Sequence, residues 1–302
     1  MTIVPVDLVT PAYRAASLVA QSLPGGVIDA AAPRLAGLLA AGGGDRRTMV
    51  ERHQRRVDPR LDGAALRRRV QQVYASYGRY YGESFRLPSI SPRELDARMS
   101  YEGFEHVDRA VDKGIGPLLC LPHLGSWEWS AYWLTRVRKL PVTAVVERIE
   151  PPALFDWFVG FRERIGMHIV PLGPEAGRAT VAAVKAGHVV ALLCDRDIGR
   201  GGVEVTFFGE RTTLPSGPAV LALRTGAPLL PTATYDEGRD HHGVIRPPVP
   251  TDRQGTFRED VARITQALAA ELEILIRRAP EQWHLMQPNW PSDRAGSGAV
   301  RL

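Results

Sequence analysis

The first hundred residues carry apolar positions at helical spacing. One face of the segment 65–85 repeats every three or four residues and bears Leu66, Val70, Val73, Tyr74, Tyr77, Tyr81 and Phe85. Segments 7–22 and 26–41 are rich in Ala, Leu and Val, and Pro24 and Gly25 separate them. This pattern predicts short helices joined by tight breaks, and therefore an N-terminal helical cap.

From about residue 115 the pattern changes to apolar runs that alternate with amphipathic segments. The predicted strands are 117–123, 142–147, 167–172, 188–195, 227–236 and 241–249, and the predicted helices are 126–137, 153–166, 177–187 and 257–278. Such alternation predicts an α/β fold with a central, mostly parallel sheet flanked by helices. We expect one functional domain, with a cap over 1–100, a core over 101–292 and a disordered tail over 293–302.

Composition narrows the class of protein. The chain has 302 residues, of which 44% are hydrophobic and 24% charged, as in an ordinary globular protein. Its two cysteines, Cys120 and Cys194, exclude a disulfide framework, and both stand in apolar strands where a small core residue is expected. No apolar run approaches the roughly 18–20 residues of a membrane-spanning helix.

The net charge of +5 is unevenly distributed. Residues 1–100 hold 15 arginines and 9 acidic residues, for a balance of +6, and the remainder of the chain has a balance of −1. The excess is densest from Arg46 to Arg69, which indicates an anionic membrane surface, a nucleic acid or simply a solvated helical face. The sequence has no recognisable nucleic-acid-binding module, so we expect no nucleic-acid partner.

The segment 122–128 is the strongest candidate for chemistry. It follows an apolar strand and precedes a helix, where α/β sheets place their active sites. His123 and Glu128 can meet if Gly125 and Ser126 form a turn, with Ser126 as N-cap. Glu128 would then accept a hydrogen bond from one ring nitrogen and leave the other as a base. Alternatively, Glu128 complements the helix dipole and His123 fills a polar turn.

Other candidates for catalytic, metal-binding or substrate-binding residues are weaker. The chain has no Gly-x-Ser-x-Gly motif, which argues against a serine hydrolase. His241 and His242 stand in a charged segment typical of a solvated hairpin tip rather than a metal site. Aromatic residues gather around the His123 motif, either as core or as the lining of a groove: Trp127, Trp129, Trp133, Phe155, Trp157, Phe158 and Phe161.

His-x4-Glu resembles the His-x4-Asp/Glu motif of glycerolipid acyltransferases. Three further stretches, 145–166, 192–231 and 281–290, are similar to the actinobacterial phosphatidylinositol mannoside acyltransferases. These enzymes fall within the lipid A biosynthesis (lauroyl/myristoyl) acyltransferase-like family. The similarity runs in one order from about residue 5 to residue 292.

The resemblance implies transfer of a long-chain acyl group, such as palmitoyl, from acyl-CoA to a mannose 6-hydroxyl of a phosphatidylinositol mannoside. His123 would be the general base and Glu128 would orient it, with acyl-CoA as co-substrate and neither a cofactor nor a metal. It also implies a peripheral protein on the cytoplasmic face of the plasma membrane, and from the charge distribution we expect the anionic membrane surface to bind the Arg46–Arg69 region. A lysophospholipid or lipid A-type acyltransferase of the same fold and an inactive lipid-binding homologue stay open as alternatives.

Three residues carry over into the site by position. Arg162 matches an arginine that the family places beside the catalytic histidine. Asp195 stands where the mannoside enzymes carry an active-site glutamate, and Glu147 matches a buried acid that would pair with Arg162. Each could instead be structural, since an arginine–carboxylate pair can tie a helix to a sheet edge.

Three further arginines are candidate substrate-binding residues. Arg224 stands where the mannoside enzymes have an acidic residue near the CoA path, and it could contact a CoA phosphate or lie exposed on a helix. Arg200 belongs to a glycine-rich stretch that could approach phosphate closely. Arg196 follows Asp195 at what could also be an ordinary polar strand end.

Overall fold

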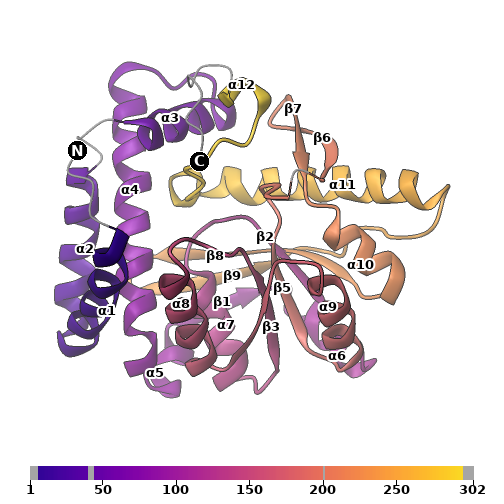
Figure 1. The fold of residues 1–302 in the computed structure, drawn as a ribbon, viewed down its shortest axis with the longest axis horizontal. Coiled ribbons are helices and arrows are strands. Elements are labelled where there is room, and N and C mark those ends of the chain that lie inside the picture. The colour runs from indigo at the N-terminus through magenta and orange to yellow at the C-terminus, as the bar shows by residue number, and fades with distance from the viewer. Residues whose placement is uncertain (1–5, 40–43, 200, 295–302) are drawn as a thin grey trace.

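The computed structural model describes residues 6–39, 44–199 and 201–294, and its N-terminal part is helical as expected. The helices are α1 (Val6–Ser22), α2 (Gly25–Leu39), α3 (Asp45–Val57), α4 (Gly63–Arg86) and α5 (Pro92–Ala97), with a short 3-10 turn at Leu87–Ser89. The apolar face of α4 buries Leu66, Val70 and Val73. Figure 1 shows α1 and α2 side by side with α4 at one side of the sheet.

The core is a seven-stranded sheet in the order β1-β9-β8-β2-β5-β3-β4. Its strands are β1 (Met99–Glu102), β2 (Leu118–Leu121), β3 (Val142–Val146), β4 (Met167–Pro171), β5 (Val189–Leu193), β8 (Leu229–Glu237) and β9 (Asp240–Ile245). Every neighbouring pair is parallel except β8 and β9, which form a hairpin. The predicted α/β class is therefore confirmed.

Helices cover both faces of this sheet (Figure 1). They are α6 (Glu105–Asp112), α7 (Trp127–Arg136), α8 (Pro152–Arg164), α9 (Ala176–Lys185), α10 (Gly217–Thr225) and α11 (Phe257–Arg278), followed by a 3-10 turn at Pro280–Gln282. Along β2, Leu118 and Cys120 enter one core cluster with α10 and α11, and Leu119 and Leu121 enter another with α7 and α8. Burial on both faces explains why the central strands are continuous apolar runs.

Other features were not expected. An antiparallel hairpin, β6 (Val203–Phe207) with β7 (Glu210–Leu214), stands apart from the main sheet. The expected boundary at residue 100 falls inside β1, a strand of the sheet. The disordered tail cannot begin at 293, because Asp293 is fully buried in α12 (Pro291–Arg294); residues 295–302 lie outside the described residues.

None of the described helices combines the length and the apolar character needed to cross a bilayer.

Candidate active site

The carboxyl ends of β2 and β5 bring His123 and Asp195 together. In this parallel pair Leu121 lies opposite Leu193, and each chain then runs two residues further, to His123 and to Asp195. Residues 72 positions apart in sequence therefore meet at one edge of the sheet. Gly125, in the turn after His123, has φ 58°, and a Cβ there would lie 1.8 Å from the Thr234 carbonyl oxygen, so the turn requires glycine.

Asp195 holds His123 through both carboxylate oxygens. Oδ1 lies 2.6 Å from His123 Nδ1, and Oδ2 accepts hydrogen bonds from the His123 backbone N–H at 3.0 Å and from Trp283 Nε1 at 2.8 Å. Burial favours the neutral carboxyl, but the charge that His123 can carry and these hydrogen bonds outweigh it, so the pKa of Asp195 lies below its ordinary value. An ionised Asp195 places the proton on Nδ1 and leaves the Nε2 lone pair free to act as a base.

The expectation that Glu128 orients His123 is wrong. Glu128 Oε1 accepts hydrogen bonds from Tyr80 Oη at 2.8 Å and from Arg162 Nη2 at 2.9 Å, and Oε2 has no hydrogen-bond partner within the described chain. Glu128 points away because it lies in the first turn of α7, facing α4 and α8. Burial raises the pKa of its carboxyl above the ordinary value, although Arg162 opposes the shift. The spacing of the motif correctly marked the turn but not the partner of the histidine.

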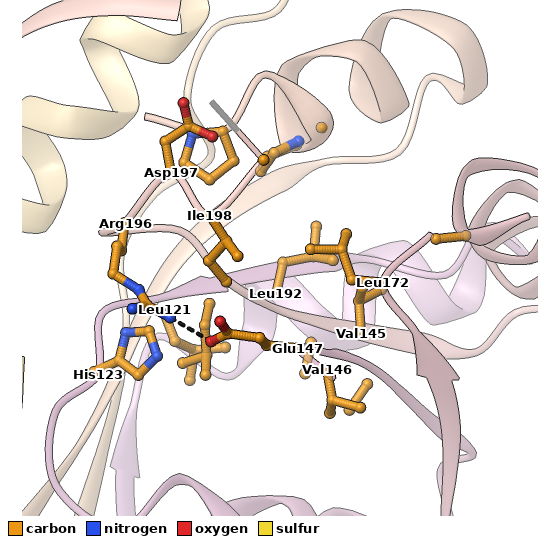
Figure 2. Close-up of a pocket in the computed structure, with 18 of the residues that line it drawn as sticks. Leu121, His123, Val145, Val146, Glu147, Leu172, Leu192, Arg196, Asp197 and Ile198 are labelled. Atoms are coloured by element: carbon orange, nitrogen blue, oxygen red, sulfur yellow. Dashed lines mark hydrogen bonds and ion pairs between the residues drawn. The ribbon is translucent and has the colours of Figure 1, made fainter. Parts of the chain in front are cut away.

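The expected pair of Glu147 with Arg162 is also wrong. Arg162 is bound to Glu128, whereas Glu147, one residue beyond β3, forms an ion pair with Arg196, three residues beyond β5. Because β3 is the parallel neighbour of β5, these two side chains reach the same edge of the sheet as His123. Figure 2 shows the Glu147–Arg196 pair next to His123.

The remaining sequence candidates lie around the same edge. Arg224 is exposed on α10 and lines the cavity described below, while Arg200 lies outside the described residues. Asp197 organises the glycine-rich loop, because its Oδ2 accepts hydrogen bonds from the Gly202 N–H at 2.9 Å and from Thr213 Oγ1 at 3.0 Å. Ser126 precedes α7 but makes no side-chain cap bond, and its hydroxyl donates to Glu83 instead.

The segment 282–289 completes the site, and sequence analysis did not assign its residues a role. Besides the Trp283 bond, Asn289 Nδ2 donates to the Asp195 carbonyl oxygen at 2.9 Å, and the His284 N–H donates to the His123 carbonyl oxygen at 2.7 Å. The family resemblance covered residues 281–290, and this was the signal in the sequence that pointed to the segment. Spacing alone could not suggest acceptors for Trp283 and Asn289, because both donate to Asp195, about 90 residues earlier in the sequence.

A cavity of about 730 Å³ opens beside His123. One end is aromatic and polar and includes Tyr77, Tyr80, Tyr81, Trp127, Phe158, Arg162 and His284. The other end is apolar and lies between the sheet and helices α9 and α10, with Val145, Leu172, Thr180, Val181, Leu192 and Val220. In Figure 2, Val145, Leu172 and Leu192 follow the cavity away from His123. The volume lies within the range of small-molecule sites.

Comparison with known proteins places the chain in a family. Residues 4–292 match the family described as bacterial lipid A biosynthesis acyltransferase. The chain belongs to this acyltransferase family. It is 40% identical to the phosphatidylinositol mannoside acyltransferase of Mycobacterium tuberculosis over 232 residues, which cover 75% of this chain and 72% of that protein.

Two further relatives agree with this assignment. The phosphatidylinositol mannoside acyltransferase of Mycolicibacterium smegmatis is 37% identical over 236 residues, covering 77% of this chain and 76% of its own. The lipid A biosynthesis acyltransferase of Haemophilus influenzae is 27% identical over 200 residues, or 64% of this chain and 59% of that protein. The predicted family resemblance is thus confirmed, and the protein is an acyltransferase.

One buried cluster of the acyltransferase has the composition of a cation site. Glu83, Asp236 and His241 bring ligand atoms within 4.8 Å of one another. His241 Nε2 lies 3.6 Å from Glu83 and Nδ1 lies 3.3 Å from Asp236, so the ring stands between two carboxylates, and Arg98 adds a cation 3.3 Å from Glu83. His241 is 1% exposed, so its expected place at a solvated tip is wrong. The absence of a metal in the reaction stays a prediction.

His284 should make the folded acyltransferase sensitive to acid. Burial lowers the pKa of this imidazole from 6.5 to about 4, whereas the unfolded chain takes up the proton near pH 6.5. Stability is therefore lost as pH falls from about 6.5 to about 4, by up to about 3 kcal/mol. Urea unfolding of wild type and His284→Gln at pH 7 and pH 4.5 should show a smaller acid loss in the variant; an equal loss would contradict this assignment.

Proposed function

We propose that this acyltransferase moves a long-chain acyl group, palmitoyl in particular, from acyl-CoA to the 6-hydroxyl of mannose in a phosphatidylinositol mannoside. The His123–Asp195 pair beside a cavity with an apolar end is the observation that carries the proposal. The names of the two mycobacterial relatives support this acceptor. The enzyme would work on the cytoplasmic face of the plasma membrane, where a soluble thioester and an embedded lipid can meet.

The chemistry follows from the placement of the base. His123 Nε2 removes the proton of the acceptor hydroxyl while its oxygen attacks the thioester carbonyl carbon, and Asp195 stabilises the imidazolium that forms. The tetrahedral oxyanion then collapses, the carbon–sulfur bond breaks, and the imidazolium proton passes to the CoA sulfur. Arg196, held by Glu147 beside His123, is the cationic side chain we assign to the oxyanion (Figure 2).

We assign a different substrate to each end of the cavity. We assign the acyl chain to the apolar end between α9 and α10, because burial of methylene groups there is favourable. The acceptor sugar takes the end with Tyr80 and His284, where aromatic faces and polar groups alternate. Arg224, at the exposed rim, would then contact the phosphates of CoA, and Arg200, which lies outside the described residues, stays a candidate from the sequence for the same role.

The apolar end can be tested by filling it. Gly177 on α9 lines the cavity, and apart from its chain neighbours and its own helix backbone no heavy atom of the described residues would lie within 4 Å of a Cβ added there. We expect Gly177→Leu to lower kcat/KM for palmitoyl-CoA about tenfold relative to octanoyl-CoA, since the longer chain loses space. Ala179→Leu, on the same helix but outside the cavity lining, is the control. Equal effects on kcat/KM for both thioesters would show that the acyl chain binds elsewhere.

Product analysis tests the proposed reaction directly. The purified enzyme is incubated with palmitoyl-CoA and a mixture of phosphatidylinositol mannoside and lysophospholipid, and the lipids are analysed by mass spectrometry. We expect one palmitoyl group on the mannoside, located on mannose by fragmentation. Acylation of the lysophospholipid alone would favour the alternative acceptor, and no transfer to either lipid would favour an inactive homologue.

A further inference from the structure

The two oxygens of the Asp195 carboxylate have different partners. The carboxylate is fully buried, and Oδ1 lies 2.6 Å from His123 Nδ1. Oδ2 accepts hydrogen bonds from the His123 backbone N–H at 3.0 Å and from Trp283 Nε1 at 2.8 Å. Among the described residues, Trp283 is the only side chain besides His123 that donates to this carboxylate. The direction of the carboxylate therefore depends on the indole N–H.

The ring of His123 depends in turn on the carboxylate. His123 stands on a turn rather than in a helix or strand, and its side chain is 30% exposed. Within the described residues, the contact with Asp195 is the one hydrogen bond of the ring. A rotation of the carboxylate would therefore shift Nε2, and small misplacements of a catalytic group reduce the rate strongly.

The backbone of Trp283 is joined to the turn that follows β2. Trp283 forms an antiparallel bridge with Leu124, and the Gly125 N–H donates to the Gln282 carbonyl oxygen at 3.0 Å. Trp283 thus contacts the turn through its backbone and the Asp195 carboxylate through its indole. These contacts join three chain segments around the base, namely those that follow β2, β5 and α11.

The indole ring of Trp283 has little room to turn. It is fully buried, and the rings of His53, Phe208 and Trp290 pack around it with centroid distances of 5.5, 5.6 and 6.4 Å. Buried side chains packed in this way keep one rotamer. The N–H donor therefore points at the carboxylate before any substrate binds, which is the condition for a preorganised site.

The same hydrogen bond affects the charge of the pair. Burial raises the pKa of Asp195, but the charge of His123 and the hydrogen bonds from His123 and Trp283 lower this pKa below its ordinary value. A donor to the ionised carboxylate favours the ionised form. Without the Trp283 N–H the ionised carboxylate is less stable, so the His123–Asp195 pair should take up a proton at higher pH.

We propose that Trp283 is a positioning residue of this acyltransferase: its hydrogen bond to Oδ2 fixes the Asp195 carboxylate, and Oδ1 then keeps the His123 ring in one orientation. Trp283 is not among the residues that line the cavity, so it acts through Asp195 and not on a substrate. The inference rests on the proposed role of His123 as the base, and it holds for any acceptor.

Trp283→Phe tests the role of the N–H, because it keeps an aromatic ring and removes the donor. We expect kcat for palmitoyl transfer to fall about ten- to 100-fold, with an unchanged KM for palmitoyl-CoA, since the base is misplaced while the binding surfaces remain. The acid limb of kcat against pH should also move to higher pH. A raised KM with an unchanged kcat would overturn the proposal.

Trp290→Phe is the matched control. Trp290 is also fully buried among these rings, and its Nε1 donates to the Phe207 carbonyl oxygen at 3.2 Å. The control therefore removes the same kind of donor without touching Asp195. It should lose about as much stability in urea as Trp283→Phe and retain the wild-type kcat and pH profile. Equal losses of kcat in the two variants, or a lower kcat of Trp283→Phe with an unchanged pH profile, would contradict the positioning role.

A closer replacement covers the case in which Trp283→Phe does not fold. 3-Benzothienylalanine at position 283 keeps the bicyclic ring and places sulfur where tryptophan has its N–H. It should lower kcat and move the acid limb in the same direction. A wild-type kcat with this side chain would show that the shape of the ring, and not its donor, matters.

An NMR titration separates this inference from the proposed function. In protein labelled with ¹⁵N-histidine, the ring signals of His123, assigned by their loss in His123→Ala, report the protonation of the pair without substrate. The pair should take up its proton at higher pH in Trp283→Phe than in wild type and Trp290→Phe. Equal titrations in all three proteins would overturn the proposal. If wild type transfers no acyl group, the proposed function fails, and the titration still decides the role of Trp283.

Discussion

His123→Ala should abolish acyl transfer while leaving the protein folded. The imidazole is the base that we place beside the cavity, and general-base catalysis contributes roughly 10²- to 10⁴-fold to such reactions. The side chain is 30% exposed, so its removal leaves a solvated gap rather than a buried void. We therefore expect kcat to fall by at least about 100-fold, with little change in unfolding midpoint and in palmitoyl-CoA affinity.

The control replaces a histidine outside the site. His168→Ala removes an exposed imidazole on β4 and should retain wild-type kcat. Transfer by His123→Ala at a rate close to that of wild type would eliminate the proposed mechanism, whatever the acceptor.

Asp195→Asn should lower kcat at least as much as loss of the histidine does. Asp195 Oδ2 accepts from two groups that can only donate, the His123 backbone N–H and Trp283 Nε1. The amide oxygen must keep that position, so the NH₂ group faces His123 Nδ1 and requires the tautomer with its proton on Nε2. That nitrogen can no longer accept the hydroxyl proton, and we expect kcat to fall about 10³-fold or more.

Glu128→Gln should distinguish the role of the Glu128 carboxylate from that of Asp195. It leaves an oxygen for Tyr80 and Arg162 but removes the charge that compensates the buried guanidinium, so we expect a loss of about 3 kcal/mol in unfolding free energy. Its kcat should fall far less than that of Asp195→Asn. Rates measured well below the unfolding temperature, together with urea unfolding, give both quantities. Equal losses of kcat would return Glu128 to the role that its spacing first suggested.

The helices and central strands of the fold were predictable from the sequence. Burial is visible residue by residue in the helical repeat that buries Val70 and Val73 and in the continuous apolar runs of β2 and β5. The β6–β7 hairpin was missed although β6 alternates between exposed and buried positions; its partner β7 buries Thr212, a polar residue that gives no apolar signal. His241 was misplaced for a related reason: polar neighbours suggested solvent, but α4 and α7 cover it.

The sequence by itself determined the class of fold, the turn that presents His123 and the family of the enzyme. Tertiary structure alone decided which carboxylate holds the histidine. The order and register of parallel strands place Asp195 opposite His123, while the direction of α7 turns the nearer Glu128 toward Arg162. Strand order depends on long-range packing that no local pattern encodes. For the same reason, the basic excess of the first hundred residues was visible in the chain, but the pairing of Arg56 with Glu210 and Asp293 was not.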